Sequence, residues 1–170
     1  MKICNWCHPD LLIVQKTVYE PSGLVCKDFV QEAESQEYGA CTFVVNGRCV
    51  KFRVAKITPT KVGQFVTLWK RVECGPIMPH DMTDSVDLFV ISVRDGQSFG
   101  QFVFPKNVLY EKGFVSKQGQ GGKRAMRVYP PWDTVDNHQA KQTQLWQLHY
   151  FLEISANNCV DIVAVQKLFG

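Results

Sequence analysis

The stretch that decides the fold is residues 40–57, ACTFVVNGRCVKFRVAKI. Two apolar runs, residues 40–45 and 49–57, flank the dipeptide Asn46-Gly47. Asn-Gly between two strand-like runs is the strongest short-range signal for a β-hairpin, because both residues tolerate the positive φ angles of a tight turn. The sequence therefore predicts an antiparallel pair of strands in this part of the chain.

The segments on either side predict further strands and several helices. Residues 87–93, DLFVISV, are apolar on both faces, which is typical of an interior strand, and Asp95-Gly96 turns the chain into a partner strand at 100–104. Residues 24–34 fit a helix somewhat better than a strand, and the segment after residue 160 fits either. Helices are predicted over residues 9–20, over 60–71 with Thr60 as the cap, from Pro105 to about residue 113, and over 136–153 with Asp136 as the cap.

This order of elements predicts an α/β protein, with a single mixed, largely antiparallel sheet and flanking helices. We expect one compact domain overall, in which residues 1–23 form an N-terminal segment with a helix and residues 24–170 form the main domain. No strand leads into a G-x-G-x-x-G motif, and no P-loop occurs, so a Rossmann fold is not expected.

Composition places few limits on function. The chain has 170 residues, of which 45% are hydrophobic and 21% charged, and a formal net charge of +3, so a basic site must come from clustering. The first residues lead into no apolar segment, and no apolar run has the length of a membrane span. We therefore expect a cytoplasmic protein that has no membrane partner.

Seven cysteines, an odd number, are expected to be mostly free thiols in such a protein. The run from Cys4 through Cys7 to His8 has the spacing of covalent haem attachment and of half a zinc site. No second ligand pair follows it, so coincidence is the favoured interpretation. We expect no metal and no cofactor, with Mg²⁺ or Mn²⁺ needed only if the protein is a nuclease.

Residues 122–133, GKRAMRVYPPWD, combine cations with rigid aromatic residues. Strand alternation places Lys123, Arg127 and Tyr129 on one face, and two prolines then hold Trp132. Cations neutralise phosphate and aromatic rings stack on bases, which predicts a nucleic-acid contact. An ordinary edge strand, whose cations discourage aggregation, is an equally weighted alternative.

A second cationic set is formed by Lys56, Lys61 and Arg71. Lys56 ends an apolar row on its strand, and it either snorkels to water or takes part in anion binding. Lys61, at the start of the predicted helix, would add to that anion site. The functional interpretation requires Lys56, Lys61 and Arg127 to converge in space.

Acid–base chemistry is poorly supported. Asp87 is interpreted as a residue that starts a strand and bonds to backbone, and Glu37 as an ion-pair partner of Lys56. The four histidines are scattered and share no motif with a serine or cysteine nucleophile: His8, His80, His138 and His149. No acyl-transfer enzyme is predicted.

Several strings together resemble the MepB-like family, from about residue 24 to residue 152. They are EYGACTF (37–43), FRVAKITPTK (52–61), GQFVTLWKR (63–71), GQFVFPK (100–106), GKRAMRVYPPWD (122–133) and QTQLWQ (142–147). The family is known mainly as bacterial proteins of unassigned function. The resemblance implies a restriction-endonuclease-like fold of the PD-(D/E)XK type.

Nucleases of that fold carry an acidic residue on one strand and (D/E)-x-K on the next, and this chain departs from the pattern. The run Val54-Ala55-Lys56 retains the lysine without a carboxylate, and Gln101-Phe102-Val103, after Asp87, lacks both. The resemblance therefore implies a degenerate catalytic motif beside a cationic groove.

Three hypotheses follow. The first is a DNA- or RNA-binding domain in which Lys56, Lys61, Arg71, Lys123 and Arg127 contact phosphates while Tyr129 and Trp132 stack on bases. The second is a divergent metal-dependent nuclease that uses Glu37, Lys56, Asp87 and Gln101. The third is a small-molecule or protein-interaction module with an apolar cleft lined by Trp69, Trp132 and Trp146.

Overall fold

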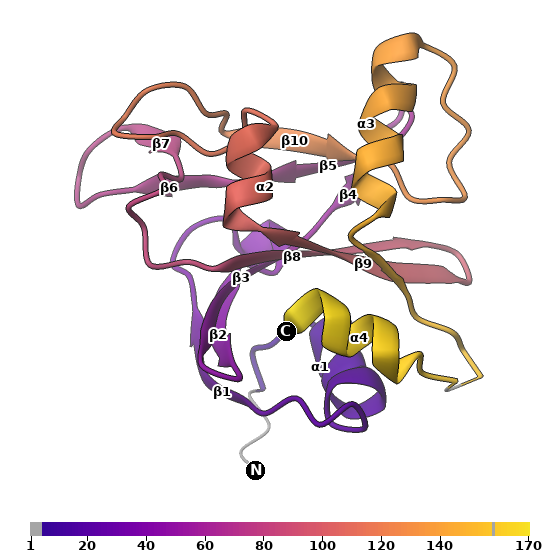
Figure 1. Ribbon diagram of the computed structural model, residues 1–170. Coiled ribbons are helices and arrows are strands. Elements are labelled where there is room, and N and C mark those ends of the chain that lie inside the picture. The colour runs from indigo at the N-terminus through magenta and orange to yellow at the C-terminus, as the bar shows by residue number, and fades with distance from the viewer. Residues whose placement is uncertain (1–4, 158) are drawn as a thin grey trace.

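The computed structural model describes residues 5–157 and 159–170 (Figure 1). Its helical elements are α1 (Pro9–Val14), a π-helical turn η1 (Gln15–Tyr19), a 3₁₀ turn η2 (Gln36–Tyr38), α2 (Lys106–Glu111), α3 (His138–Leu148) and α4 (Ile162–Phe169). Its strands are β1 (Cys26–Gln31), β2 (Cys41–Val45), β3 (Arg48–Val54), β4 (Lys56–Ile57), β5 (Gln64–Thr67), β6 (Trp69–Arg71), β7 (Ile77–Pro79), β8 (Leu88–Asp95), β9 (Ser98–Pro105), β10 (Ala125–Val128) and β11 (Phe151–Glu153).

The strands form a large sheet and two small ones. The large sheet has six strands in the order β1-β2-β3-β8-β9-β11, and all its neighbours are antiparallel except the parallel pair β3–β8. A three-stranded sheet has the order β10-β5-β4, and β6 pairs with β7. The mixed sheet with flanking helices that the sequence predicts is confirmed.

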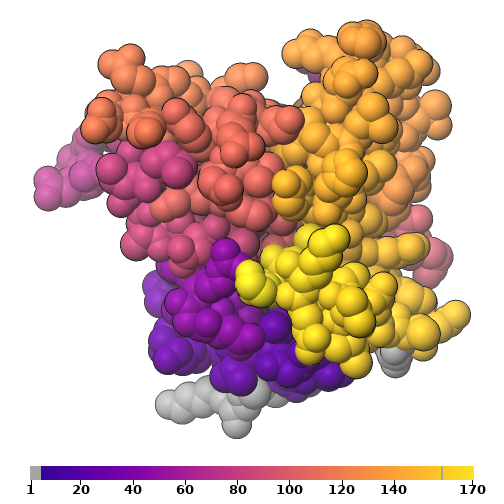
Figure 2. All heavy atoms as spheres, viewed as in Figure 1, coloured from indigo at the N-terminus to yellow at the C-terminus, as the bar shows by residue number. Residues whose placement is uncertain are grey.

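The large sheet separates two hydrophobic cores. On one face, α1, η1 and α4 cover a core that includes Phe43, Phe52 and Phe169. On the other face, the three-stranded sheet, α2 and α3 enclose Phe89, Phe102 and their neighbours (Figure 1). Figure 2 shows the C-terminal segment lying against the N-terminal one, where Phe169 packs edge-on against Tyr19. The division of the chain at residue 23 stays a prediction, although α1 shares a core with β2 and β3.

The predicted hairpins are present. Val45 pairs with Arg48 across a two-residue turn in which Asn46 and Gly47 have φ angles of 47° and 83°. β8 and β9 form the second hairpin, and α2 follows it as expected. No helix among the described residues is long and apolar enough to cross a membrane.

The helix predicted over residues 60–71 is wrong, since this segment forms β5 and β6. Gln64, Val66 and Leu68 are buried while Phe65 and Thr67 are partly exposed, which is the alternation of a strand. Large residues at positions 65, 68 and 69 imitate a helical stripe, but pairing with β4 and β10 favours the extended chain.

Two other helical predictions are corrected. The segment 24–34 contains β1 (Cys26–Gln31) rather than a helix, since these residues pair with β2 at the edge of the large sheet. The helix predicted over residues 136–153 is shorter: α3 is capped by the side chain of Asn137 rather than by Asp136, and residues 151–153 form β11. Leu152, expected on the helix, is buried where β11 pairs with β9.

Candidate nucleic-acid interface

The three-stranded sheet brings together two cations that lie far apart in the sequence. Phe65 on β5 pairs with Lys56 on β4 and with Arg127 on β10. Directly paired residues project from the same face of a sheet, so the two cations flank Phe65, two strand spacings or roughly 10 Å apart. We call Lys56, Phe65 and Arg127 the cation row.

Aromatic rings support both cations of the row. The Lys56 ammonium lies 4.5 Å from the centre of the Tyr38 ring, and the Arg127 guanidinium carbon lies 5.9 Å from that of Phe65. The two rings contact each other edge-on at 6.4 Å. Cations over aromatic faces are attracted by the ring quadrupole, so the row is held without a carboxylate.

Arg127 also fixes the loop that carries Lys61. Its guanidinium donates hydrogen bonds to Thr58 Oγ1 at 2.8 Å and to the Gly63 carbonyl oxygen at 3.2 Å. Gly63 has a φ of +82°, and a Cβ there would meet the ring of Tyr129 at 2.6 Å. Glycine at position 63 therefore lets the loop close against Tyr129.

Beside the row, a groove runs between this loop, β10 and the start of α3. It consists of two adjoining hollows of about 460 and 270 Å³, and Arg127 and Tyr129 line both. Lys61 lines the larger hollow, where Asp136 contributes a carboxylate. Asn137, Gln139 and Thr143 supply neutral hydrogen-bonding groups.

The cations of this surface have no direct ion-pair partner in the described part of the chain, although Asp136 lines the larger hollow. Within residues 5–157 and 159–170, Lys56, Lys61 and Arg127 form no ion pair. Lys56 and Lys61 are exposed, whereas Arg127 is half-buried. Among the described residues, three cations beside the one carboxylate of the groove give the surface an excess of positive charge.

The other residues predicted to bind nucleic acid lie elsewhere. Arg71, on β6, is paired with Glu34 at 2.9 Å, and Lys123 lies 5.1 Å from the ring of Phe114. Trp132 packs edge-on against Phe151 in the second core. Of the predicted set, the structure therefore gathers Lys56, Lys61, Arg127 and Tyr129.

The four residues of the nuclease hypothesis do not converge. Gln101 is fully buried and accepts a hydrogen bond from the Tyr19 hydroxyl group while donating one to Ser92 Oγ at 2.9 Å. Asp87 accepts a hydrogen bond from the backbone N–H of Cys49 at 2.8 Å and lies immediately before β8. Five residues, about 17 Å of strand, separate it from Ser92, which lies beside Gln101.

Glu37 is exposed on η2 and has no ion pair among the described residues, so the proposed partnership with Lys56 is not formed. Nor do the described residues include a cluster of three His, Cys, Asp or Glu side chains placed to hold a metal ion. Cys4 of the Cys4–His8 motif lies outside the described residues. His8 is the N-cap of α1, and its Nδ1 accepts a hydrogen bond from the Asp10 N–H at 3.2 Å.

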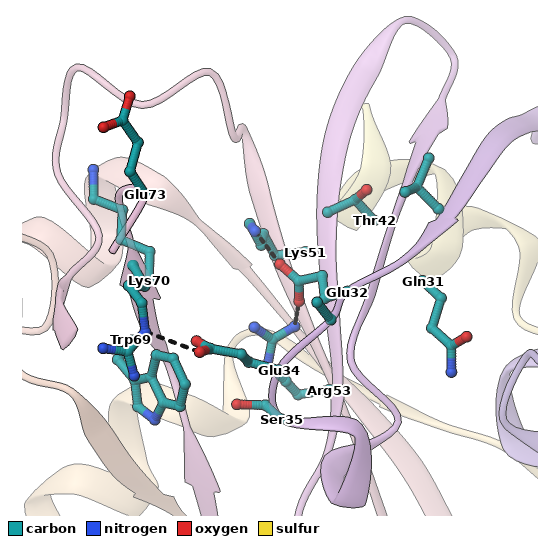
Figure 3. Close-up of a pocket in the computed structure, with 13 residues that line it drawn as sticks. Gln31, Glu32, Glu34, Ser35, Thr42, Lys51, Arg53, Trp69, Lys70 and Glu73 are labelled. Atoms are coloured by element: carbon teal, nitrogen blue, oxygen red, sulfur yellow. Dashed lines mark hydrogen bonds and ion pairs between the residues drawn. The ribbon is translucent and has the colours of Figure 1, made fainter. Parts of the chain in front are cut away.

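The sequence did not predict a charged cleft of about 530 Å³ between residues 30–35, β3 and β6 (Figure 3). On β3, Lys51 and Arg53 point toward Glu32, which is ion-paired with both. On the opposite wall, Arg71 lies over the ring of Trp69, 5.6 Å from its centre. We call this the Glu32–Trp69 cleft.

The charged side chains of the Glu32–Trp69 cleft change the pKa values of Glu32 and of the buried His80. Burial works against ionisation of Glu32, but the charges of Arg53 and Lys51 outweigh it and lower the pKa of that carboxyl group. Burial, together with the charges of Lys51 and Arg53, lowers the pKa of His80 to about 4. The cleft therefore combines an ionised carboxylate with cations, and the charges of two of these cations help to keep the buried His80 neutral.

A sequence signal for this cleft exists. Lys51 and Arg53 alternate with Val50, Phe52 and Val54 along a strand, so two cations share the face opposite an apolar one. The partner Glu32 is harder to find, because it follows β1, in a segment whose pattern fits a helix somewhat better than a strand.

Comparison with known proteins identifies the family. The MepB-like family model matches residues 32–153. A solved structure described as the crystal structure of MepB is 37% identical, covers 86% of this chain and 97% of its own, and has a TM-score of 0.74. The chain belongs to the MepB-like family.

A second structural match is to a bacterial homing endonuclease, I-Ssp6803I. It is 12% identical, covers 82% of this chain and 86% of its own, and has a TM-score of 0.42. At that level the likeness carries no argument about the MepB-like site. The search of curated proteins found no match.

Proposed function

We propose that this MepB-like chain binds a single strand of DNA or RNA across the cation row and the adjoining groove. Lys56, Lys61 and Arg127 would contact phosphates, and Tyr129 would stack on a base. The observation that carries the proposal is the pairing of Lys56 and Arg127 with the same residue, Phe65, on either side. Two cations at a fixed spacing, without carboxylate partners, suit a chain of phosphates.

The groove favours a single strand over a duplex. Its wall contains a half-buried aromatic ring, Tyr129, beside hydrogen-bonding side chains of α3. Stacking on a protein ring requires an unpaired base, whereas a duplex keeps its bases stacked within the helix. Arg127 is already anchored by the loop it holds, so little of its side-chain freedom remains to be lost on binding.

Lys56 and Arg127 also lie on the two edge strands of the three-stranded sheet, where cations protect against edge-to-edge association. Binding measurements separate these two roles. A protective role predicts no affinity for nucleic acid and greater self-association when the cations are replaced.

The experiment is fluorescence anisotropy with a short labelled oligonucleotide over a range of salt concentrations. For single strands, the slope of log affinity against log salt concentration is about −0.7 per phosphate neutralised, so three contacts predict a slope of about −2. The triple variant Lys56→Met, Lys61→Met and Arg127→Met is expected to lose roughly tenfold in affinity or more, and most of that slope.

The matched control is Lys16→Met, Lys27→Met and Lys167→Met, which removes the same charge from η1, β1 and α4. All three lysines are exposed and unpaired among the described residues. Binding that is absent, insensitive to salt, or equally weakened by the control variant would contradict the proposal.

A further inference from the structure

The Glu32–Trp69 cleft continues the face of the cation row. Along β5 and β6, the alternate residues Phe65, Thr67 and Trp69 follow one another, and the first two occupy the same face. Thr67 Oγ1 donates a hydrogen bond to Ser35 Oγ at 3.4 Å, and Ser35 lines the cleft. The row and the cleft are therefore linked by Thr67 and Ser35.

The wall formed by the large sheet carries more positive than negative charge. Lys51 and Arg53 share a single carboxylate, Glu32, so one positive charge of this group stays uncompensated. The Arg53 side chain is 3% exposed, and its Nε is buried without a hydrogen-bond partner among the described residues. This buried positive charge lies behind Lys51, and it is screened less by water than an exposed charge would be, so it strengthens the attraction of Lys51 for an anion.

The opposite wall presents a flat ring. Trp69 is half-buried, and the guanidinium of Arg71 lies over its indole face. Arg71 covers that face, so a planar base stacks on Trp69 only when the Arg71 side chain moves aside. Arg71 is held there by an ion pair with Glu34, whose side chains are 36% and 45% exposed, and by a hydrogen bond that it donates to the Gly75 carbonyl oxygen at 2.8 Å. Exposed contacts of this kind contribute little stability, so Arg71 can be displaced.

We propose that the Glu32–Trp69 cleft binds one nucleotide, with its phosphate monoester at Lys51 and its base stacked on Trp69. Its volume lies in the range of small-molecule sites. Four cations and three carboxylates line it, and one of the cations, Lys70, is ion-paired with Asp84. The charge available to an anion is therefore local, at Lys51 and Arg53, while the carboxylates can accept hydrogen bonds from a base (Figure 3). The nucleotide is either free or the phosphorylated end of a strand; the second source rests on the proposed function.

The test is isothermal titration calorimetry with adenosine monophosphate, and with adenosine as the matched ligand that lacks the phosphate. We expect the monophosphate to bind at least tenfold more tightly than adenosine. Lys51→Met and Trp69→Leu are each expected to weaken that binding about tenfold, and Lys51→Arg to restore it. Lys16→Met, on η1, is the control, and thermal melting verifies that each variant is folded.

Oligonucleotides with and without a terminal phosphate distinguish the two sources. Preference for the phosphorylated strand assigns the site to a strand end, and binding of the monophosphate without that preference assigns it to a free nucleotide. The inference is overturned if neither phosphorylated ligand binds, if adenosine binds as tightly, or if Lys51→Met and Trp69→Leu have no effect.

The two proposals fail separately. Strand binding that the cation-row triple variant abolishes, with no binding of the monophosphate, would leave the proposed function standing and end this one. If the protein and the triple variant both bind the monophosphate, but the protein has no affinity for any strand, the nucleotide site stands and the proposed function is contradicted.

Discussion

Arg127 has two roles: it holds a loop in place, and it is one of the cations proposed to bind phosphate. Its guanidinium holds the loop at Thr58 and Gly63 through two hydrogen bonds and lies over the ring of Phe65. A lysine could supply the same charge but not the fork of donors that reaches both loop positions. The groove beside the cation row therefore depends on the residue type at position 127 as well as on its charge.

His80 is the residue whose protonation is expected to control stability. It is 2% exposed, and its pKa of about 4 lies below the ordinary 6.5, so it stays neutral in the folded protein between pH 5 and pH 7 while the unfolded chain takes up a proton. The free energy of unfolding should therefore fall by about 2 kcal/mol between pH 7 and pH 5. Urea denaturation at the two pH values measures this change.

The matched variant is His80→Gln, which lacks the titrating group. This range lies above the ordinary pKa of carboxyl groups, so Glu32 and Asp84 contribute little to the change. The variant should lose most of the pH dependence, whatever its stability at pH 7. A wild-type protein that is equally stable at both values would contradict this account.

At the scale of elements, turn residues predicted secondary structure more reliably than the spacing of apolar side chains did. The β2–β3 hairpin follows from Asn46-Gly47, because few other dipeptides accept two positive φ angles. Residues 60–71 were assigned to a helix because both their apolar spacing and Thr60 fit one. Pairing of β5 with strands from residues 56–57 and 125–128, which no local pattern reveals, decides against that helix.

The hairpin gives a direct prediction. Gly47 has a φ of +83°, and a side chain in that conformation costs about 1–2 kcal/mol. Gly47→Ala should lower the free energy of unfolding by about that amount, measured by urea denaturation. Gly47→Asn is the matched variant and should be less destabilising, because asparagine tolerates the left-handed region. Equal losses for the two variants would show that the turn conformation is not the cause.

The candidate site was predicted only in part from the sequence. Strand alternation around residues 123–129 correctly placed Met126 and Val128 in the core and Arg127 on the opposite face. The meeting of Arg127 with Lys56 depends on a sheet that joins three distant segments, so the sequence could state it only as a condition. The Glu32–Trp69 cleft needs β1, β3 and β6 to be placed in three dimensions.

On the scale of the whole molecule, one side of the large sheet is covered by a hydrophobic core, and the other side carries the proposed binding surfaces. The side covered by α1, η1 and α4 is a continuous core, which includes Leu11, Val165 and Phe169. The three-stranded sheet lies on the other side (Figure 1) and carries the cation row, and residues of β6 line the Glu32–Trp69 cleft. Exposed residues of α4 should therefore be replaceable without effect on binding.

The most direct measurement of the central claim is amide chemical-shift mapping by NMR while a single-stranded oligonucleotide is titrated into the labelled protein. The account predicts that the largest perturbations fall on residues 56–67 and 125–129 and on the first turn of α3. It also predicts that they disappear in the Lys56, Lys61 and Arg127 triple variant. Perturbations confined to α1 and α4, or none at saturating oligonucleotide, would contradict the claim that the cation row is the nucleic-acid interface.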